Sequence, residues 1–290
     1  MEHFLEGRRR QMPDIKNTIK HGIDYMKKPK EAYLPIVEVK RDGDLLAGKH
    51  ALVTGGSGGI GFAIARKLVA CGAKVIIAGT NEEKLRCKAS ELGHGSEWLR
   101  IDMLDPASFK DKVDQARSML EGLDILVCSA GIHMNYQGLD FLNVDESQYD
   151  RIMAINLKGT YFMAQAFARC LIAHGDGGHI LMVSSQSALE PAWSPYRLSK
   201  HGVSEITKGI AQRLLEHGIV VNGIGPGPTA TSMQPYMPGG SINTDQNPIG
   251  RYTMPEEVAE YAALMVSSLG DTIVGDTLYM SGGRGVIEIR

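Results

Sequence analysis

The chain has 290 residues, 43% hydrophobic and 22% charged, and its formal net charge of −2 gives no electrostatic basis for binding nucleic acid or an anionic membrane. Its four cysteines form no Cys-x-x-Cys pair and no cluster with histidine, which indicates reduced thiols in an intracellular protein and no metal site. The sequence contains no signal-peptide core and no run of membrane-spanning length, so we expect a cytoplasmic protein without a membrane partner.

Residues 1–45 differ in pattern from the rest of the chain and are expected to form an N-terminal extension. The stretch begins with charged residues and then carries three isoleucines at helical spacing, Ile15, Ile19 and Ile23. Two prolines that follow would end any helix. The extension is either a mobile tail or an arm that packs its isoleucines on the main domain or on a neighbouring subunit, and we favour the arm.

Residues 46–290 are predicted to form a single Rossmann-type domain. Apolar runs predict strands at 51–53, 74–78, 98–101, 123–128, 180–183, 219–224 and 277–280. Helices are predicted at 62–71, from about 82, and at 107–120, 148–174, 196–216 and 255–269. This alternation of strands and helices predicts an α/β fold, a doubly wound and mostly parallel seven-stranded sheet with helices on both faces.

A glycine-rich segment joins the first predicted strand to the first predicted helix. Glycine allows the backbone to adopt positive φ and to approach a ligand closely, and a helix N-terminus offers N–H groups to a pyrophosphate. No Gly-Lys-Ser/Thr follows, so the segment is not a Walker loop. We therefore expect a dinucleotide to contact Thr54, Gly55, Ser57, Gly59, Ile60 and Gly61.

The residues after the second strand bear on which dinucleotide binds. A carboxylate there would bind the ribose of NAD, and a basic residue would suit the 2′-phosphate of NADP. The chain has Thr80 and Asn81, with two basic side chains nearby, Lys84 and Arg86. No acid stands at that point, so we favour NADP over NAD. After the third strand, Asp102, followed by Met103, is placed to accept from the adenine amino group, or is simply a surface turn residue.

Tyr196 and Lys200 lie four residues apart at the start of a predicted helix, so they share one helix face. A phenol has a pKa near ~10, and a nearby ammonium favours its anion. A fall of ~3 pKa units would correspond to roughly 4 kcal/mol. Ser185, at the end of the preceding strand, could hydrogen-bond the same reacting oxygen. On spacing alone, an ordinary amphipathic helix that carries Tyr and Lys remains an alternative.

Taken together, the motifs resemble the short-chain dehydrogenase/reductase family over about residues 45–283, especially its 3-oxoacyl reductases and sugar or polyol dehydrogenases. The matching stretches are 54–61, the turn at Asp102, 123–131, 155–159, 183–185, 196–200, 221–227, 255–258 and 281–283. The resemblance implies an NAD(P)-dependent oxidoreductase that interconverts a carbonyl and a secondary alcohol by direct hydride transfer, as a homodimer or homotetramer. The alternative is a catalytically silent dinucleotide-sensing protein on the same fold.

The resemblance also implies four catalytic roles. Tyr196 would be the general acid in reduction and the base in oxidation. Lys200 would bind the nicotinamide ribose and lower the pKa of the tyrosine, and Ser185 would orient the substrate oxygen. Asn156 would hold a water that links Lys200 to solvent. Further cofactor contacts are implied for Ala130, Gly131, Pro226, Gly227 and Thr229, with the Thr229 hydroxyl near the carboxamide.

Two features depart from the pattern of the family. Cys128 and Ser129 stand where asparagines are usual, so we expect an altered brace beside the cofactor rather than lost activity. The loop between the fifth strand and the following helix is shorter than usual. The role assigned to Ser185 could therefore fall to Ser184 or Ser187.

A segment at about 229–250, rich in Met, Pro, Gly and Asn, is expected to cover the substrate as a lid. The substrate is expected to meet Ser185, Ser187, Trp193 and Tyr196, with further contacts from Leu189, Met233, Tyr236 and Met237. The methionines slightly favour an acyl group or a hydrophobic ketone. His133 could line the same pocket, but an exposed loop histidine is the expectation.

Overall fold

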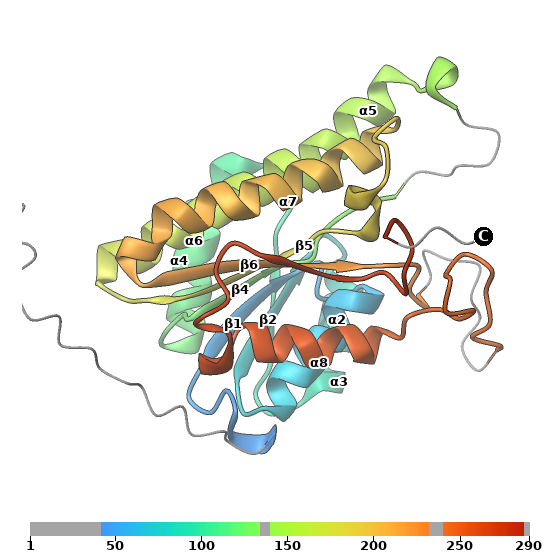
Figure 1. Ribbon diagram of the computed structural model, residues 1–290. Helices are drawn as coiled ribbons and strands as arrows, with labels where there is room; N and C mark the ends of the chain where they lie inside the picture. The colour runs from blue at the N-terminus through green and yellow to red at the C-terminus, as the bar shows by residue number, and fades with distance from the viewer. Residues whose placement is uncertain (1–41, 134–139, 232–239, 287–290) are drawn as a thin grey trace, which may run out of the picture. The chain divides into compact units, whose positions relative to one another are not determined.

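The computed structural model describes residues 42–133, 140–231 and 240–286, and its centre is one parallel sheet (Figure 1). The strands are β1 (His50–Thr54), β2 (Lys74–Gly79), β3 (Glu97–Arg100), β4 (Ile125–Cys128), β5 (Gly178–Val183), β6 (Ile219–Pro226) and β7 (Thr277–Met280). Their order is β3-β2-β1-β4-β5-β6-β7, and every pairing is parallel. The predicted doubly wound, seven-stranded sheet is therefore confirmed. Its strand order reverses between β1 and β4, which is where ligands bind in such sheets.

Helices cover both faces of the sheet (Figure 1). One face carries α2 (Gly59–Ala70), α3 (Glu82–Leu92) and α8 (Pro255–Met265), and the other carries α4 (Phe109–Leu120), α6 (Thr160–His174) and α7 (Pro195–Leu214). Successive residues of β1 pack into the two different cores, Val53 into the first and Leu52 into the second. Because both faces are covered, the strands appear in the sequence as continuous apolar runs.

The helix predicted over 148–174 is not one uninterrupted α-helix, and that prediction is wrong in detail. The chain forms α5 (Glu146–Ile152), then a π-helical turn (Met153–Gly159), and then α6. Single π turns inside helices are rare and frequently occur at functional sites. Similarly, the helix predicted to reach residue 269 ends at Met265 and is followed by a short 3-10 turn, Ser268–Gly270.

Several expectations fall wholly or partly outside the described residues. They concern most of the N-terminal extension, whose residues 1–41 are not described, and the lid residues Met233, Tyr236 and Met237. The described residues of the expected lid, 229–231 and 240–250, form no helix and no strand beyond two isolated bridges, Thr229 to Thr253 and Asn243 to Arg251. No helix in the described part of the chain has the length and apolar character of a membrane span.

Candidate active site

A cavity of about 650 Å³ lies at the carboxyl ends of the strands near the switch point. It brings together the glycine-rich segment, the end of β2 and the Tyr/Lys pair, which lie up to 146 positions apart in the sequence. The predicted site residues in its wall are Thr54, Gly55, Ser57, Gly59, Ile60, Gly61, Thr80, Asn81, Asp102, Met103, Ala130, Gly131, Tyr196 and Lys200.

The glycine-rich segment forms a cradle in which side chains would not fit. The backbone at Gly55 has φ of +66°, and a Cβ there would lie 2.7 Å from Cα of Ala130. A Cβ on Gly61 would run into the carbonyl oxygen of Gly55. Helix α2 begins at Gly59 without a side-chain cap, so its first N–H groups are open to an anion. These features fit the pyrophosphate of a dinucleotide.

The cavity wall at the end of β2 is polar and carries one lysine. Asn81 caps α3, because its Oδ1 accepts a hydrogen bond of 2.9 Å from the backbone N–H of Lys84. Lys84 is also one of the residues that line the cavity. Arg86 does not, and its guanidinium lies 5.7 Å from the ring centre of Trp98. Lys84 is therefore the basic group at this end of the cavity.

Asp102 is a turn residue that also borders the cavity, and its contact with adenine stays a prediction. Its Oδ1 accepts a hydrogen bond of 2.9 Å from the backbone N–H of Leu104, as a turn residue does. Asp102 and Leu104 also both line the cavity. One carboxylate oxygen thus shapes the turn, and the side chain still borders the ligand space.

Tyr196 and Lys200 lie in the first two turns of α7, which is capped by Ser194. The Nζ atom of Lys200 is 5.8 Å from the centre of the Tyr196 ring and donates a hydrogen bond of 2.9 Å to the carbonyl oxygen of Val183. Lys200 is only 7% exposed. This burial disfavours the ammonium form and lowers the pKa of Lys200 to about 8.

Asn156 lies in the π turn, behind the cavity wall. Its Oδ1 accepts a hydrogen bond of 2.8 Å from the N–H of Ile132, and its Nδ2 donates to the carbonyl of Ile132 at 2.9 Å and to Oγ of Ser199 at 3.2 Å. The loop that follows β4 is thereby fixed against α7. A Cβ on Gly131 would lie 3.6 Å from the Nζ atom of Lys200.

The three serines near the end of β5 have different surroundings. Ser184 lines the cavity, but its hydroxyl donates to the carbonyl of Lys200 at 3.0 Å and lies 2.7 Å from Oγ of Ser204. Ser185 is not in the wall of the cavity, and its Oγ accepts a hydrogen bond of 3.1 Å from the N–H of Ser187. Among the described residues, Ser185 makes no hydrogen bond as a donor, so its hydroxyl proton is available.

Thr54 braces β1 against the end of β4, beside Cys128 and Ser129, which stand where the family usually has asparagines. The hydroxyl of Thr54 donates to the carbonyl of Val127 and accepts from the N–H of Ala130, both at 3.3 Å. Cys128 is buried, and its desolvation raises the pKa of the thiol to about 12. Cys128 therefore acts as an apolar residue of the core.

Several predicted contacts lie outside the cavity wall, namely those of Asn156, Ser185, Ser187, Trp193, Pro226, Gly227 and Thr229. The hydroxyl of Thr229 donates to the carbonyl of Gly227 at 2.8 Å. Two positions later, Thr231 does line the cavity. The sequence did not predict Thr231. Thr229 and Thr231 lie two positions apart in an irregular segment, and no sequence pattern indicates which of the two faces the cavity.

Arg151 also lines the cavity and was not predicted. It lies four positions before Ile155, which also lines the cavity, and residues four apart share one face of a helix. The prediction covered only Asn156 in this helix, and Asn156 lies outside the wall.

His133 is not an exposed loop residue, so that expectation is wrong. Its ring centre is 4.5 Å from that of Tyr196, with an angle of 61° between the ring planes. The residue is half-buried. An imidazole therefore lies directly beside the predicted acid.

Comparison with known proteins identifies the family. A family model described as enoyl-(acyl carrier protein) reductase matches residues 55–284. The 3-oxoacyl-(acyl-carrier-protein) reductase FabG of Rickettsia bellii is 33% identical over 247 residues, which cover 82% of this chain and 97% of that protein. The chain belongs to the short-chain dehydrogenase/reductase family. The resemblance inferred from the motifs is thereby confirmed.

Other short-chain dehydrogenases/reductases match over a similar length. Gluconate 5-dehydrogenase of Gluconobacter oxydans is 33% identical over 248 residues, which cover 82% of this chain and 95% of that protein. The crystal structure of a 3-ketoacyl-(acyl-carrier-protein) reductase from Brucella melitensis, complexed with NADH, has a TM-score of 0.75 at 29% identity and covers 83% of this chain and 99% of that one. The chain is an oxidoreductase of a family whose named members are reductases and dehydrogenases.

Proposed function

We propose that the protein interconverts a carbonyl and a secondary alcohol with NAD(P) as the hydride carrier, acting on a ketone, a 3-oxoacyl group or a sugar or polyol. One observation carries this proposal: Tyr196 and Lys200 lie in the wall of the same cavity as the glycine-rich cradle, Thr54–Gly61. The nicotinamide, when bound, supplies or takes the hydride. The side chains of the protein then have to move one proton and stabilise one oxygen.

Tyr196 gives the proton to the substrate oxygen in reduction and takes it back in oxidation. With a pKa of about 8, the Lys200 ammonium is still the main form at pH 7, and a positive charge beside a phenol favours its anion. The Val183 carbonyl orients the lysine. Ser184 already donates its own proton, whereas the hydroxyls of Ser185 and Ser187 accept hydrogen bonds and donate none within the described part of the chain. Ser185, which directly follows the residue that ends the cavity wall at β5, is the serine that we assign to the substrate oxygen.

The role proposed for Asn156 is to support the proton path. Its amide holds the backbone of Ile132, which keeps the neighbouring Gly131 close to Lys200. A water held at the π turn would then connect Lys200 with solvent.

NADP is the preferred cofactor in this proposal. Ser57, Thr80 and Lys84 form a polar wall with one cationic side chain, which suits a 2′-phosphate. The Brucella reductase was crystallised with NADH, so both dinucleotides need testing. Binding constants for NADPH and NADH check the preference. Lys84→Met should weaken NADPH binding and leave NADH binding nearly unchanged, and equal weakening of both would contradict the assignment.

The substrate proposal rests on the relatives, which include a 3-oxoacyl reductase and a gluconate dehydrogenase. Purified protein incubated with NADPH or NADH and a panel of ketones, 3-oxoacyl thioesters and oxidised sugars would reveal the class. Tyr196→Phe should lower turnover by roughly 10²- to 10⁴-fold while dinucleotide binding persists. Cofactor binding without turnover of any carbonyl would instead support a dinucleotide sensor.

We also propose a homodimer or homotetramer. Exposed aromatic and apolar side chains lie on α5, α6 and α7, at Tyr149, Tyr161, Phe162 and Leu198. A second set lies on α8 and the edge strand β7, at Tyr261 and Leu278. Two separate faces of this kind favour the tetramer, and sedimentation of the purified protein tests it.

A further inference from the structure

The turn that carries Ser185 ends in a carboxylate that holds it to the rest of the site. Residues Gln186–Leu189 form one 3-10 turn, and the Ser185 hydroxyl caps it by accepting the N–H of Ser187. Glu190 follows directly at the other end of the turn. The two ends belong to one hydrogen-bonded unit, so whatever holds Glu190 also restrains Ser185.

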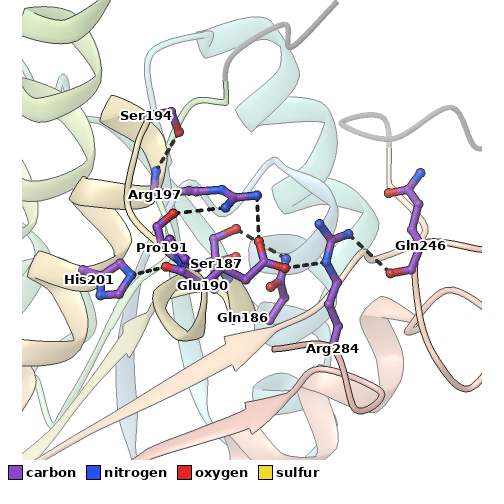
Figure 2. Close-up of polar contacts among 10 residues, drawn as sticks. Gln186, Ser187, Glu190, Pro191, Ser194, Arg197, His201, Gln246 and Arg284 are labelled. Atoms are coloured by element: carbon purple, nitrogen blue, oxygen red, sulfur yellow. Dashed lines mark hydrogen bonds and ion pairs between the residues drawn. The ribbon is translucent and has the colours of Figure 1, made fainter. Parts of the chain in front are cut away.

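Two guanidinium groups from different segments bind the Glu190 carboxylate (Figure 2). Nη2 of Arg197 is 2.8 Å from Oε2, and Nε of Arg284 is 2.6 Å from Oε1. The Glu190 side chain is only 13% exposed. Ion pairs at such a site are screened less by water and salt than pairs on the surface, so they hold their geometry better.

The first of these contacts reaches the turn of α7 that carries the proposed acid. Arg197 follows Tyr196 directly in the chain. The backbone carbonyl of Glu190 also accepts a hydrogen bond of 2.7 Å from Nε2 of His201, which follows Lys200. Glu190 is therefore tied to the immediate neighbours of both members of the Tyr/Lys pair.

The second contact reaches the lid. Nη1 of Arg284 donates a hydrogen bond of 3.3 Å to the carbonyl oxygen of Gln246 (Figure 2). The segment after β7 also packs closely on the serine turn, since a Cβ on Gly285 would lie 2.9 Å from Cβ of Leu189. The serine turn, helix α7 and the lid are thus connected through one carboxylate.

We propose that Glu190 is a positioning residue of the oxidoreductase: it sets the placement of Ser185 relative to Tyr196 and, through Arg284, holds the lid. The inference rests on the function proposed above. Without the carboxylate, the guanidinium groups of Arg197 and Arg284 would repel each other, and the serine turn would lose its attachment to α7. The short loop noted in the sequence makes this attachment direct, because only ten residues separate Ser185 from Tyr196.

Steady-state kinetics of three variants, two at Glu190 and one at Arg284, test the proposal and isolate the contact with Arg284. Glu190→Gln should lower kcat by roughly 10- to 100-fold, since a misplacement of about 1 Å can cost this much, while NADPH binding stays unchanged. Glu190→Asp, which keeps a carboxylate, should recover part of kcat. Arg284→Met leaves the pair of Glu190 with Arg197 intact, so it should raise the substrate KM and change kcat little.

A matched control breaks an ion pair elsewhere. Glu256→Gln removes the 2.7 Å contact with Arg66 that joins α8 to α2, and it should change neither kcat nor KM. In a double-mutant cycle, Arg197→Met should cost much less in the Glu190→Gln background than in the wild type. Additive effects, or an unchanged kcat in Glu190→Gln, would overturn the proposal.

Hydrogen exchange gives a readout that needs no turnover. Glu190→Gln should speed exchange at the amides of Ser187 and Arg197, which are bonded to the hydroxyls of Ser185 and Ser194, and leave α2 protected. Unchanged exchange at both amides would refute the positioning role. If the wild type turned over no carbonyl while Glu190→Gln still exchanged faster at these amides, the proposed function would be refuted and the structural role of Glu190 would be supported.

Discussion

Replacing Lys200 by methionine should stabilise the protein at neutral pH while it removes the proposed chemistry. The ammonium is buried, and its pKa falls from 10.5 to about 8. Because the unfolded chain binds the proton more tightly, wild-type stability rises with pH between about 8 and 10.5 and carries the full penalty below pH 8. That penalty amounts to about 3 kcal/mol at pH 7. Methionine is long, unbranched and apolar, so it can fill the same space without this desolvation penalty.

The gain is reduced by the hydrogen bond that is lost. Lys200 donates to the carbonyl of Val183, and leaving that buried acceptor unpaired costs about 1–3 kcal/mol. Lys200→Met should therefore be more stable than the wild type by about 1 kcal/mol at pH 7. At pH 10 most of the free-energy cost of burying the Lys200 ammonium is gone from the wild type, so Lys200→Met should be the less stable protein.

Urea unfolding at pH 7 and pH 10 measures this crossover, at one fixed protein concentration because an oligomer would make stability concentration-dependent. Repeating both proteins in the Tyr196→Phe background removes the titration of the phenol. Lys208→Met, on the exposed side of the same helix, should show no comparable crossover. If the difference between Lys200→Met and wild type were the same at both pH values, the reasoning from burial would be refuted.

Three further predictions follow from single contacts. Gly61→Ala should weaken dinucleotide binding and cost roughly 1–3 kcal/mol of stability, because the new methyl group meets the Gly55 carbonyl; normal binding by calorimetry would contradict this. Thr231→Val should weaken dinucleotide binding by roughly 3- to 10-fold, and Thr229→Val should weaken it less. A larger effect of Thr229→Val would instead support the predicted cofactor contact of Thr229. Glu257 accepts two hydrogen bonds from Arg251, which lower the pKa of its half-exposed carboxyl to about 2. Glu257→Gln should therefore lower the free energy of unfolding by about 1 kcal/mol at pH 7, and this difference should disappear as the pH falls from 5 towards 2. A difference that stays constant across acid unfolding curves would rule this out.

Local patterns explain why so much of the site could be predicted. The glycine-rich segment between β1 and α2 and the four-residue spacing of Tyr196 and Lys200 are set by neighbouring residues in the chain. Parallel strands then bring their carboxyl ends to one edge of the sheet, so both motifs reach the same cavity.

Other features depend on contacts that no local pattern records. The π turn that holds Asn156 interrupts the helix predicted over 148–174, and it has no signature in hydrophobic periodicity. The contact of His133 with Tyr196 joins two segments 63 positions apart. In the same way, nothing near Glu190 in the sequence predicts a partner at Arg284.

The sequence by itself determined the sheet, the glycine-rich cradle and the pairing of a phenol with an amine, because periodicity and short-range spacing specify backbone geometry. Only the tertiary structure decided that Thr231 rather than Thr229 lines the cavity, that Ser184 donates its proton within the protein, and that Glu190 connects α7 with Arg284. The physical reason is that these choices depend on how side chains from distant segments fill one space, and packing is settled only when those segments meet.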